Sequence, residues 1–515
     1  MDHQREVVSF LSDGATYGMP GLRVERIETH ISIIFLAGDR AFKLKRAVRF
    51  SYLDYSTTAL RGVFCKKELD LNLRTAASLY VRVRAITRQA GGNLAFDGDG
   101  TVIDWVVEML RFAQTDLFDQ LAHSKTLNSR LMRDLTDAIV EFHAGAEITP
   151  HHGGRAGIEE TIDGNNVNLV QSSPPLDGKQ IQELYVASMA KLAALGGLLD
   201  SRRERGRVRR CHGDLHLRNV CLFEGRPTLF DCIEFNDTLS CIDVLYDLAF
   251  LLMDLVRQDL HDLANVVFNR YLDLTTDIDG LSALPLFMSV RAAVRAQVAG
   301  ALRRQNQTPQ ALAEARSYFS LAGAVLRPNP PILVAIGGLS GVGKSTMAQA
   351  LAPDFKPSPG ARVVRSDVLR KRVFNVTPET KLPPSAYENA ITERVYGALQ
   401  EAVLASLAAG YATIADATFL REEERRRIAA CAERCGVRFV GLWLEAPSEI
   451  LAARIGGRSG DASDADLSVL KQQIGVDIGA VGWQRIHATS DVTETLAAAR
   501  VLIDRRRREL GMVSA

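Results

Sequence analysis

The sequence lacks the features of a membrane-spanning or disulfide-bonded protein. No stretch reaches about 18 uninterrupted apolar residues, so we expect no transmembrane helix and no membrane partner. The seven cysteines include no C-x-x-C pair, and Cys431 and Cys435, at helical spacing, are better explained as core or surface residues than as metal ligands. The first segment, MDHQREVVSFLSDG, has acidic residues and no long apolar run, which argues against a secretory signal. These absences favour a cytoplasmic protein.

Net charge is also small. The chain carries +1 at pH 7, so no overall field favours a nucleic-acid or membrane partner. Its 47% apolar and 24% charged residues are ordinary for a globular protein, and 515 residues are too many for one core of usual size. We therefore expect about two to four domains.

The most specific motif present is a glycine-rich loop within residues 332–351. An aliphatic run typical of a buried strand leads into GLSGVGKS, and a segment of high helix propensity follows. This is the complete G-x-x-x-x-G-K-[ST] pattern in the strand-to-helix setting that it requires. Such a loop binds polyphosphate through backbone N–H groups, its lysine reaches the β- and γ-phosphates, and its serine binds magnesium. The predicted ATP-binding residues are Gly338, Ser340, Gly341, Val342, Gly343, Lys344, Ser345 and Thr346, and Ser345 is also a predicted metal ligand.

A second constellation centres on residues 210–220, RCHGDLHLRNV. Asp214 in this stretch is followed by Asn219, and Asp231 stands twelve residues further on in a strand-like segment. This is the arrangement of a kinase catalytic loop, in which the first aspartate accepts or orients the proton of the acceptor hydroxyl. The asparagine and the second aspartate hold the magnesium ions that bridge the ATP phosphates.

A possible lysine–glutamate pair precedes this loop. Residues 31–37 and 41–48 are predicted as two strands of a hairpin, and Lys43 and Lys45 share one face of the second strand. A helix predicted after them carries Glu68.

With HGDLHLRN as the most specific part, residues 25–320 resemble the aminoglycoside phosphotransferase and choline kinase superfamily, the small-molecule branch of the protein-kinase-like fold. The resemblance implies an α+β bilobal domain over residues 1–326, with an N-lobe to about residue 110, and an adenine pocket lined by residues 107–111. It implies that Asp214 is the catalytic base, that Asn219 and Asp231 are metal ligands, and that Lys43 binds ATP with Glu68 as its ion-pair partner. Lys45 remains a competing candidate for the ATP lysine, because the pleat places it on the same face.

This first domain departs from the kinase pattern in two ways. No G-x-G-x-x-G precedes the lysine strand, where residues 28–32 stand instead, and His216 replaces the usual lysine, which favours a small-molecule acceptor. Asp243 and Asp247 are expected to anchor the catalytic loop, and His143 is expected to be a satisfied buried histidine.

The best domain boundary lies at residues 327–331. Residues 248–326 are almost wholly helical in pattern, which suits an acceptor-binding subdomain, and Arg-Pro-Asn-Pro-Pro then supplies three prolines in five residues. Residues 332–515 are predicted to form an α/β P-loop domain with a parallel sheet.

Candidate catalytic residues of this second domain follow its predicted strands. Asp367, after residues 361–365, is predicted to take the proton of the acceptor hydroxyl, and Arg370 to bind a phosphate or carboxylate. A helix N-cap with an exposed arginine is the alternative. Asp416 ends another predicted strand without the second acidic residue usual there, and is a candidate either for holding magnesium through water or for positioning the acceptor. Arg454 and Arg458 are predicted to close over the transferring phosphoryl group, with a plain surface loop as the alternative.

Together these motifs resemble the polynucleotide kinase, zeta toxin and related P-loop kinase group over residues 332–500. Three arginines at residues 425–427 are expected to be a solvated helical face. The leading hypothesis is a bifunctional kinase that uses ATP and Mg²⁺ at two sites, each transferring the γ-phosphoryl group to a hydroxyl of a small molecule. The alternative is a nucleic-acid or toxin-type kinase, regulated by the first domain as a nucleotide sensor. It draws on the basic residues Arg362, Arg365, Arg370, Lys371 and Arg372. Neither the identity of the acceptors nor the oligomeric state follows from the sequence.

Overall fold

The computed structural model of the chain describes residues 2–50, 52–171, 176–306, 309–456, 463–488 and 491–508. Its contacts divide the chain into two compact units, Met1–Asn166 with Met189–Asp254, and Val167–Ser188 with Leu255–Ala515. The linker boundary at residues 327–331 remains a prediction. No helix in the described ranges is long and apolar enough to cross a bilayer.

The first unit contains a six-stranded antiparallel sheet in the order β1-β2-β3-β8-β6-β7. Gly38 and Asp39 turn the β2–β3 hairpin, as predicted, with Ala37 paired to Arg40 and Gly38 in the left-handed region at φ 60°. The strand bearing the two lysines ends at Lys45 rather than at residue 48. The bounds are β1 Glu25–Glu28, β2 Ser32–Ala37, β3 Arg40–Lys45, β6 Tyr80–Arg88, β7 Leu94–Phe96 and β8 Thr101–Leu110, with a separate hairpin of β4 Arg49–Phe50 and β5 Leu53–Asp54.

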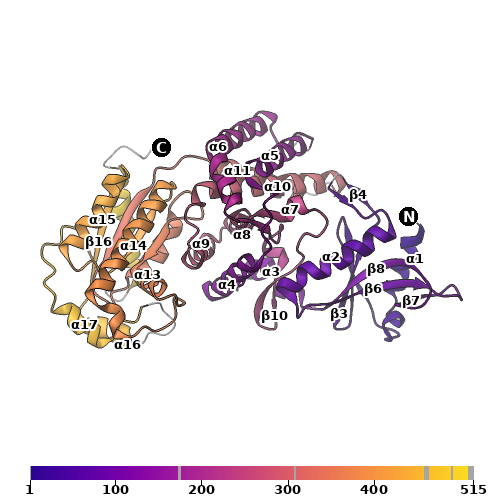
Figure 1. The fold of residues 1–515 in the computed structure, drawn as a ribbon, viewed down its shortest axis with the longest axis horizontal. Coiled ribbons are helices and arrows are strands. Elements are labelled where there is room, and N and C mark those ends of the chain that lie inside the picture. The colour runs from indigo at the N-terminus through magenta and orange to yellow at the C-terminus, as the bar shows by residue number, and fades with distance from the viewer. Residues whose placement is uncertain are drawn as a thin grey trace. The chain divides into compact units, whose positions relative to one another are not determined.

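Helix α2 (Thr58–Ala76) packs across this sheet (Figure 1). The hydroxyl of Thr57 caps its N-terminus by accepting from the N–H of Leu60. Its Cys65 and Ala76 join a core with Leu36, Val107 and other sheet residues, which fixes the helix against the strand that carries the lysines. The helix thereby brings Glu68 beneath β3.

Helices dominate the rest of this half of the chain, with short strand pairs around the catalytic loop. Strands β10 and β11 pair with each other, as do β12 and β9. The bounds are α1 Asp2–Ser12, α3 Phe118–His123, α4 Ser129–Gly145, α5 Gly154–Gln171, α6 Gly178–Glu204, β9 Val208–Arg210, β10 Val220–Phe223, β11 Arg226–Leu229, α7 Asp237–Ser240, β12 Cys241–Asp243 and α8 Val244–Arg257.

The second unit is built on a five-stranded parallel sheet in the order β14-β15-β13-β16-β17. Such an order is that of a doubly wound sheet, with ligands expected at the carboxyl ends beside the central strand. Its strands are β13 Ile332–Gly337, β14 Arg362–Arg365, β15 Thr413–Asp416, β16 Arg438–Glu445 and β17 Gln484–His487. Its helices are α9 His261–Thr275, α10 Leu284–Asn306, α11 Pro309–Val325, α12 Lys344–Leu351, α13 Ser366–Val373, α14 Asn389–Ala408, α15 Glu422–Arg434, α16 Ser448–Gly456, α17 Leu467–Ile474 and α18 Val492–Arg508.

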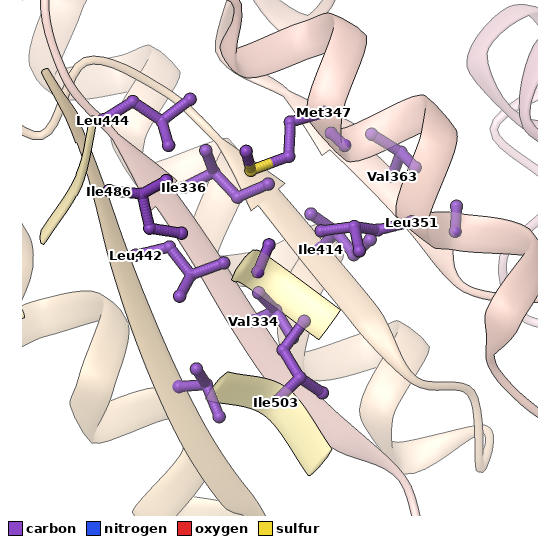
Figure 2. Packing of buried hydrophobic residues seen from close by; sticks show 14 of the residues in the cluster. Val334, Ile336, Met347, Leu351, Val363, Ile414, Leu442, Leu444, Ile486 and Ile503 are labelled. Carbon is purple, nitrogen blue, oxygen red and sulfur yellow. The ribbon is translucent and has the colours of Figure 1, made fainter. Parts of the chain in front are cut away.

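Helices cover both faces of this sheet. Figure 2 shows Met347 and Leu351 of α12 and Ile503 of α18 packed on Val334 and Ile336 of the central strand. A second core, on the opposite face, joins sheet residues to α13, α14 and α15. Burial of the sheet on both faces explains why its strands are nearly continuous apolar runs.

Helix α9 is tied to strand β14 within the second unit. The amide of Asn265 donates to the carbonyls of Pro359 and Ala361, both at 3.1 Å, and the N–H of Val363 donates to Asn269 Oδ1 at 2.8 Å. Arg362 pairs with Asp273, and both side chains are largely buried, at 4% and 14% exposed. These contacts fix the strand that ends at Arg365, and Asp367 follows it in the first turn of α13.

Candidate active sites

In the first unit, the lysine–glutamate pair predicted from the sequence is present, and a second lysine joins it. Lys43 Nζ lies 2.8 Å from Glu68 Oε1, and Lys45 Nζ lies 2.6 Å from Glu68 Oε2. Burial alone would raise the pKa of Glu68, but the two ammonium groups lower it to about 2. Glu68 is therefore an ionised carboxylate held by two cations at neutral pH.

The two lysines differ in their second partners. Lys43 also pairs with Asp231, whose side chain is 40% exposed. Lys45 pairs with Glu234 instead, and Tyr55 donates its hydroxyl to the same Glu234 carboxylate. Burial disfavours both ammonium groups, yet their carboxylate partners raise the pKa of each lysine above its usual value. Sequence reasoning missed Glu234 and Tyr55, and the only available signal was the position of Glu234 three residues after Asp231.

The catalytic loop brings Asp214 and Asn219 together. Asn219 Nδ2 donates at 2.9 Å to both the backbone carbonyl and Oδ2 of Asp214, and His216 Nε2 lies 3.3 Å from the same carboxylate oxygen. The Asp214 side chain is 37% exposed. An accessible carboxylate fixed by an amide suits the binding of a hydroxyl proton.

Asp231 is not in a strand, contrary to the sequence expectation. Strand β11 ends at Leu229, and Asp231 adopts a left-handed conformation with φ 65°. Its N–H donates to the hydroxyl of Tyr80 at 3.3 Å, and its neighbour Cys232 donates to Asn72 Oδ1 at 2.9 Å. The strand pattern failed because this turn is fixed by contacts with residues more than 150 positions earlier.

Asp247 anchors the loop, as predicted. Its carboxylate accepts from the N–H groups of His212 at 3.1 Å and of Gly213 at 2.9 Å, and it lies 3.2 Å from His143 Nε2. His143 is buried with this partner, also as predicted. Asp243 instead takes two bonds from the buried guanidinium of Arg202, at 2.8 and 2.9 Å.

In the second unit, the glycine-rich loop follows the central strand and opens helix α12. Gly338, with φ 135°, and Gly341, with φ 87°, adopt conformations that L side chains rarely take. A Cβ on Gly338 would lie 2.5 Å from the carbonyl oxygen of Leu444. Ser340 and Val342 are buried, and Gly343 caps the helix that begins at Lys344. Lys344 Nζ donates to the Leu339 carbonyl at 3.0 Å, the folded-back position of this side chain.

The two predicted metal ligands of this domain, Ser345 and Asp416, share one cation. Arg365 Nη2 donates to Ser345 Oγ at 3.1 Å, and Arg365 Nε lies 3.4 Å from Asp416 Oδ2. Asp416 is 4% exposed at the end of β15. A hydroxyl and a carboxylate converging on one positive group are the oxygen ligands that magnesium prefers, so these residues fit the metal.

Asp367 lies in the first turn of α13, near this centre. Burial raises the pKa of Asp367, and the negative charge of Asp416 raises it further, while Arg365 and Lys344 oppose the shift. Arg370 is buried at 6% exposed, which excludes the alternative of an exposed arginine. It donates to the Ala386 carbonyl at 2.7 Å and stacks 4.6 Å from the ring centre of Tyr387.

Arg454 lines a cavity of about 290 Å³ beside the loop. Arg454 Nη1 donates weakly to the carbonyls of Val342 at 3.4 Å and Ala488 at 3.3 Å. Arg458 lies outside the described residues. The other residues of the cavity come from the loop, α12, β16 and the start of α18: Gly341, Val342, Gly343, Thr346, Met347, Ala350, Leu444, Ala488, Val492, Thr495 and Leu496.

One expectation about basic residues needs correction. Arg425 is not solvated; it is 4% exposed and donates to the carbonyls of Phe419, Leu420, Ile478 and Ala480. Of the basic residues on which the nucleic-acid alternative draws, Arg362 pairs with Asp273 and Lys371 pairs with Asp464, so these two are already neutralised within the protein. Partners this distant in the chain leave no periodic signal in the sequence.

Comparisons with known proteins agree with both halves of this description. Residues 76–284 match the phosphotransferase enzyme family, and residues 333–476 match a family described as an AAA domain. The chain therefore carries two kinase-type domains, a phosphotransferase domain and a P-loop kinase domain, and is an enzyme of the phosphotransferase class.

Among curated relatives, uncharacterized proteins of Mycobacterium tuberculosis and Mycobacterium bovis are 28% identical over 454 residues, which cover 86% of this chain and 88% of theirs. Among solved structures, a choline kinase from Cryptosporidium parvum is 10% identical, covers 63% of this chain and 95% of its own, and has a TM-score of 0.39. A gluconokinase from Sinorhizobium meliloti is 20% identical, with coverage of 36% and 97% and a TM-score of 0.27.

Proposed function

We propose that the chain is a bifunctional, magnesium-dependent kinase of the cytoplasm, in which each domain transfers the γ-phosphoryl group of ATP to a hydroxyl of a small molecule. The observation that supports the proposal is that each unit holds a lysine, an aspartate and further oxygen-bearing side chains of the kinds that these roles require. In the first unit these are Lys43, Asp214, and Asn219 with Asp231. In the second they are Lys344, Asp367, and Ser345 with Asp416.

In the first site, Asp214 accepts the proton of the acceptor hydroxyl, since its carboxylate is accessible and is oriented by Asn219. The amide nitrogen of Asn219 is used on Asp214, which leaves its oxygen as a metal ligand beside Asp231. Lys43, now paired with Asp231, is the cation that turns to the ATP phosphates. Magnesium, when bound, neutralises the charge on those phosphates.

In the second site, the loop amides and Lys344 bind the polyphosphate, and Asp367 accepts the acceptor proton. A raised pKa makes Asp367 a stronger base than an ordinary aspartate. Arg370, stacked on Tyr387, binds an anionic group of the acceptor. Arg454 lines the cavity beside the loop together with Met347 and Val492, where its guanidinium would stack on the adenine ring. This changes the role that we predicted for it from the sequence.

The test is to make Asp214→Ala and Lys344→Ala singly in the full chain. ATP consumption would be followed over a panel of sugars, sugar nucleotides and aminoglycosides, with 5′-hydroxyl and 3′-hydroxyl oligonucleotides included. Two activities, each abolished by one substitution alone, support the proposal. Turnover that no condition makes sensitive to Asp214→Ala contradicts the first site, and phosphorylation of oligonucleotides alone contradicts the small-molecule acceptor of the second.

A further inference from the structure

The segment 463–474 of the second unit contacts the P-loop site at three points. The hydroxyl of Ser463 is hydrogen-bonded to the Asp367 carboxylate. The carboxylate of Asp464 is bound by residues on α13 and on the segment after it. At the other end, the carboxamide oxygen of Gln473 on α17 accepts from the N–H of Ser340 in the glycine-rich loop, at 2.8 Å.

Asp464 holds Ser463 in place. Its Oδ2 accepts from the N–H of Leu382 at 3.0 Å, from the Tyr387 hydroxyl at 2.7 Å and from the ammonium group of Lys371. The Lys371 side chain is 1% exposed and that of Asp464 is 9% exposed, so the pair is shielded from solvent. Three hydrogen-bond donors hold the Asp464 carboxylate in place, and Ser463 is the preceding residue in the chain.

The Ser463 hydroxyl is therefore bound to the carboxylate for which we propose the role of accepting the proton of the acceptor hydroxyl. Asp367 is the proposed base, and it lies in the first turn of α13, two residues after Arg365 at the end of β14. Arg365 contacts both proposed metal ligands, Ser345 Oγ at 3.1 Å and Asp416 Oδ2 at 3.4 Å, so this end of β14 adjoins the place where the γ-phosphoryl group and its metal would lie. A hydroxyl bound to this carboxylate faces the transferring group, and its proton already has an acceptor.

We propose that Ser463 is an intramolecular phosphoryl acceptor of the P-loop site, a modification that rests on the kinase function proposed for that site. The Ser463 Oγ attacks the γ-phosphorus of ATP, the bond from that phosphorus to the β–γ bridging oxygen breaks, and ADP leaves. The hydroxyl proton passes to the Asp367 carboxylate. Because a small-molecule hydroxyl must use the same position, a bound acceptor protects Ser463 from modification.

The experiment incubates the full chain with Mg²⁺ and γ-labelled ATP in the absence of any acceptor, and locates the label by peptide mass spectrometry. Label on Ser463 is expected, lost in Ser463→Ala and Lys344→Ala, and slowed about 10²-fold or more in Asp367→Asn. Ser468→Ala is the matched control, since Ser468 lies on the same segment with its hydroxyl on Asp466, and it should keep the label. The rate per molecule should not change when the protein is diluted.

Binding of MgATP, measured by calorimetry on the wild type and Lys344→Ala, separates the two proposals. Lys344-dependent binding without label on Ser463 overturns the inference and leaves the kinase site standing. Absence of that binding overturns both. Label on other residues, or a rate proportional to protein concentration, also overturns it, because neither follows from a tethered hydroxyl on Asp367.

Discussion

Lys43 and Lys45 bind the two oxygens of one carboxylate, that of Glu68, at 2.8 and 2.6 Å. Two residues apart on one strand, they share a face as the pleat requires, but they reach different second partners. Lys43 extends to the half-exposed Asp231, and Lys45 extends to the buried Glu234. We therefore propose Lys43 as the ATP lysine and a structural role for Lys45.

This assignment predicts opposite effects for two matched substitutions. Lys43→Met should lower kcat/KM for ATP at the first site by about 10²-fold or more with little loss of stability, since solvent can reach Asp231. Lys45→Met leaves Glu234 buried without its cation and should cost about 3–5 kcal/mol of unfolding free energy. Urea unfolding and ATP kinetics of both variants check this. A stable, inactive Lys45→Met beside an unstable Lys43→Met would reverse the assignment.

Asp247 should be required for the geometry of the catalytic loop. In Asp247→Asn an amide group replaces one of the oxygens that accept from His212 and Gly213. A buried N–H left without an acceptor costs about 1–3 kcal/mol. We expect a lower midpoint of thermal unfolding and reduced turnover at the first site. Asp70→Asn, at an exposed position of α2, is the control and should change neither.

The ion pair between α9 and β14 should contribute strongly to stability. Asp273→Asn leaves the buried guanidinium of Arg362 without its carboxylate and should cost about 3–5 kcal/mol. Glu379→Gln breaks the neighbouring pair with Arg270, in which Glu379 is 45% exposed, and should cost less than about 1 kcal/mol. Equal effects in denaturant unfolding would show that burial does not distinguish the two pairs.

Asp367 should reduce stability at neutral pH. Its folded-state pKa is raised, so the folded chain binds this proton more tightly than the unfolded chain does. The ionised Asp367 carboxylate therefore lowers the free energy of unfolding at pH values above its folded-state pKa. This destabilisation disappears below the ordinary aspartate pKa of about 3.9. Asp367→Asn should unfold at a higher temperature than the wild type at about pH 8, with a difference that shrinks towards about pH 4. A wild type that is more stable than the variant at the higher pH would contradict this sign.

The parts of the fold that sequence reasoning could predict were those with a local pattern. The GLSGVGKS loop, the alternation of Lys43 and Lys45, and the spacing of Asp214 and Asn219 each lie within one element, and the structure has them in that form. The anchoring role of Asp247 followed from its place after the loop. The parallel sheet and the kinase-like first domain followed from the same motifs.

The rest depends on contacts between residues far apart in the chain. Lys371 meets Asp464 across 93 positions, and Ser340 meets Gln473 across 133. Arg425 is expected to be one of three solvated arginines because its sequence neighbourhood does not distinguish it from Arg426 and Arg427, yet it donates to two carbonyls five and six residues earlier and to two others more than 50 residues later. Ordinary residue types at such separations carry no periodicity, so only the folded chain identifies them.

The bonds from α9 to β14 bear on how this chain can be divided. Helix α9 lies within residues 76–284, which match the phosphotransferase family, yet it packs in one compact unit with the P-loop sheet. A split gene encoding the chain on either side of residues 327–331 would separate Asn265, Asn269 and Asp273 from the strand that they hold. Co-expressed halves should therefore reassociate through this helix, and the P-loop half alone should be poorly soluble, because Arg362 and the edge of β14 would be left uncovered.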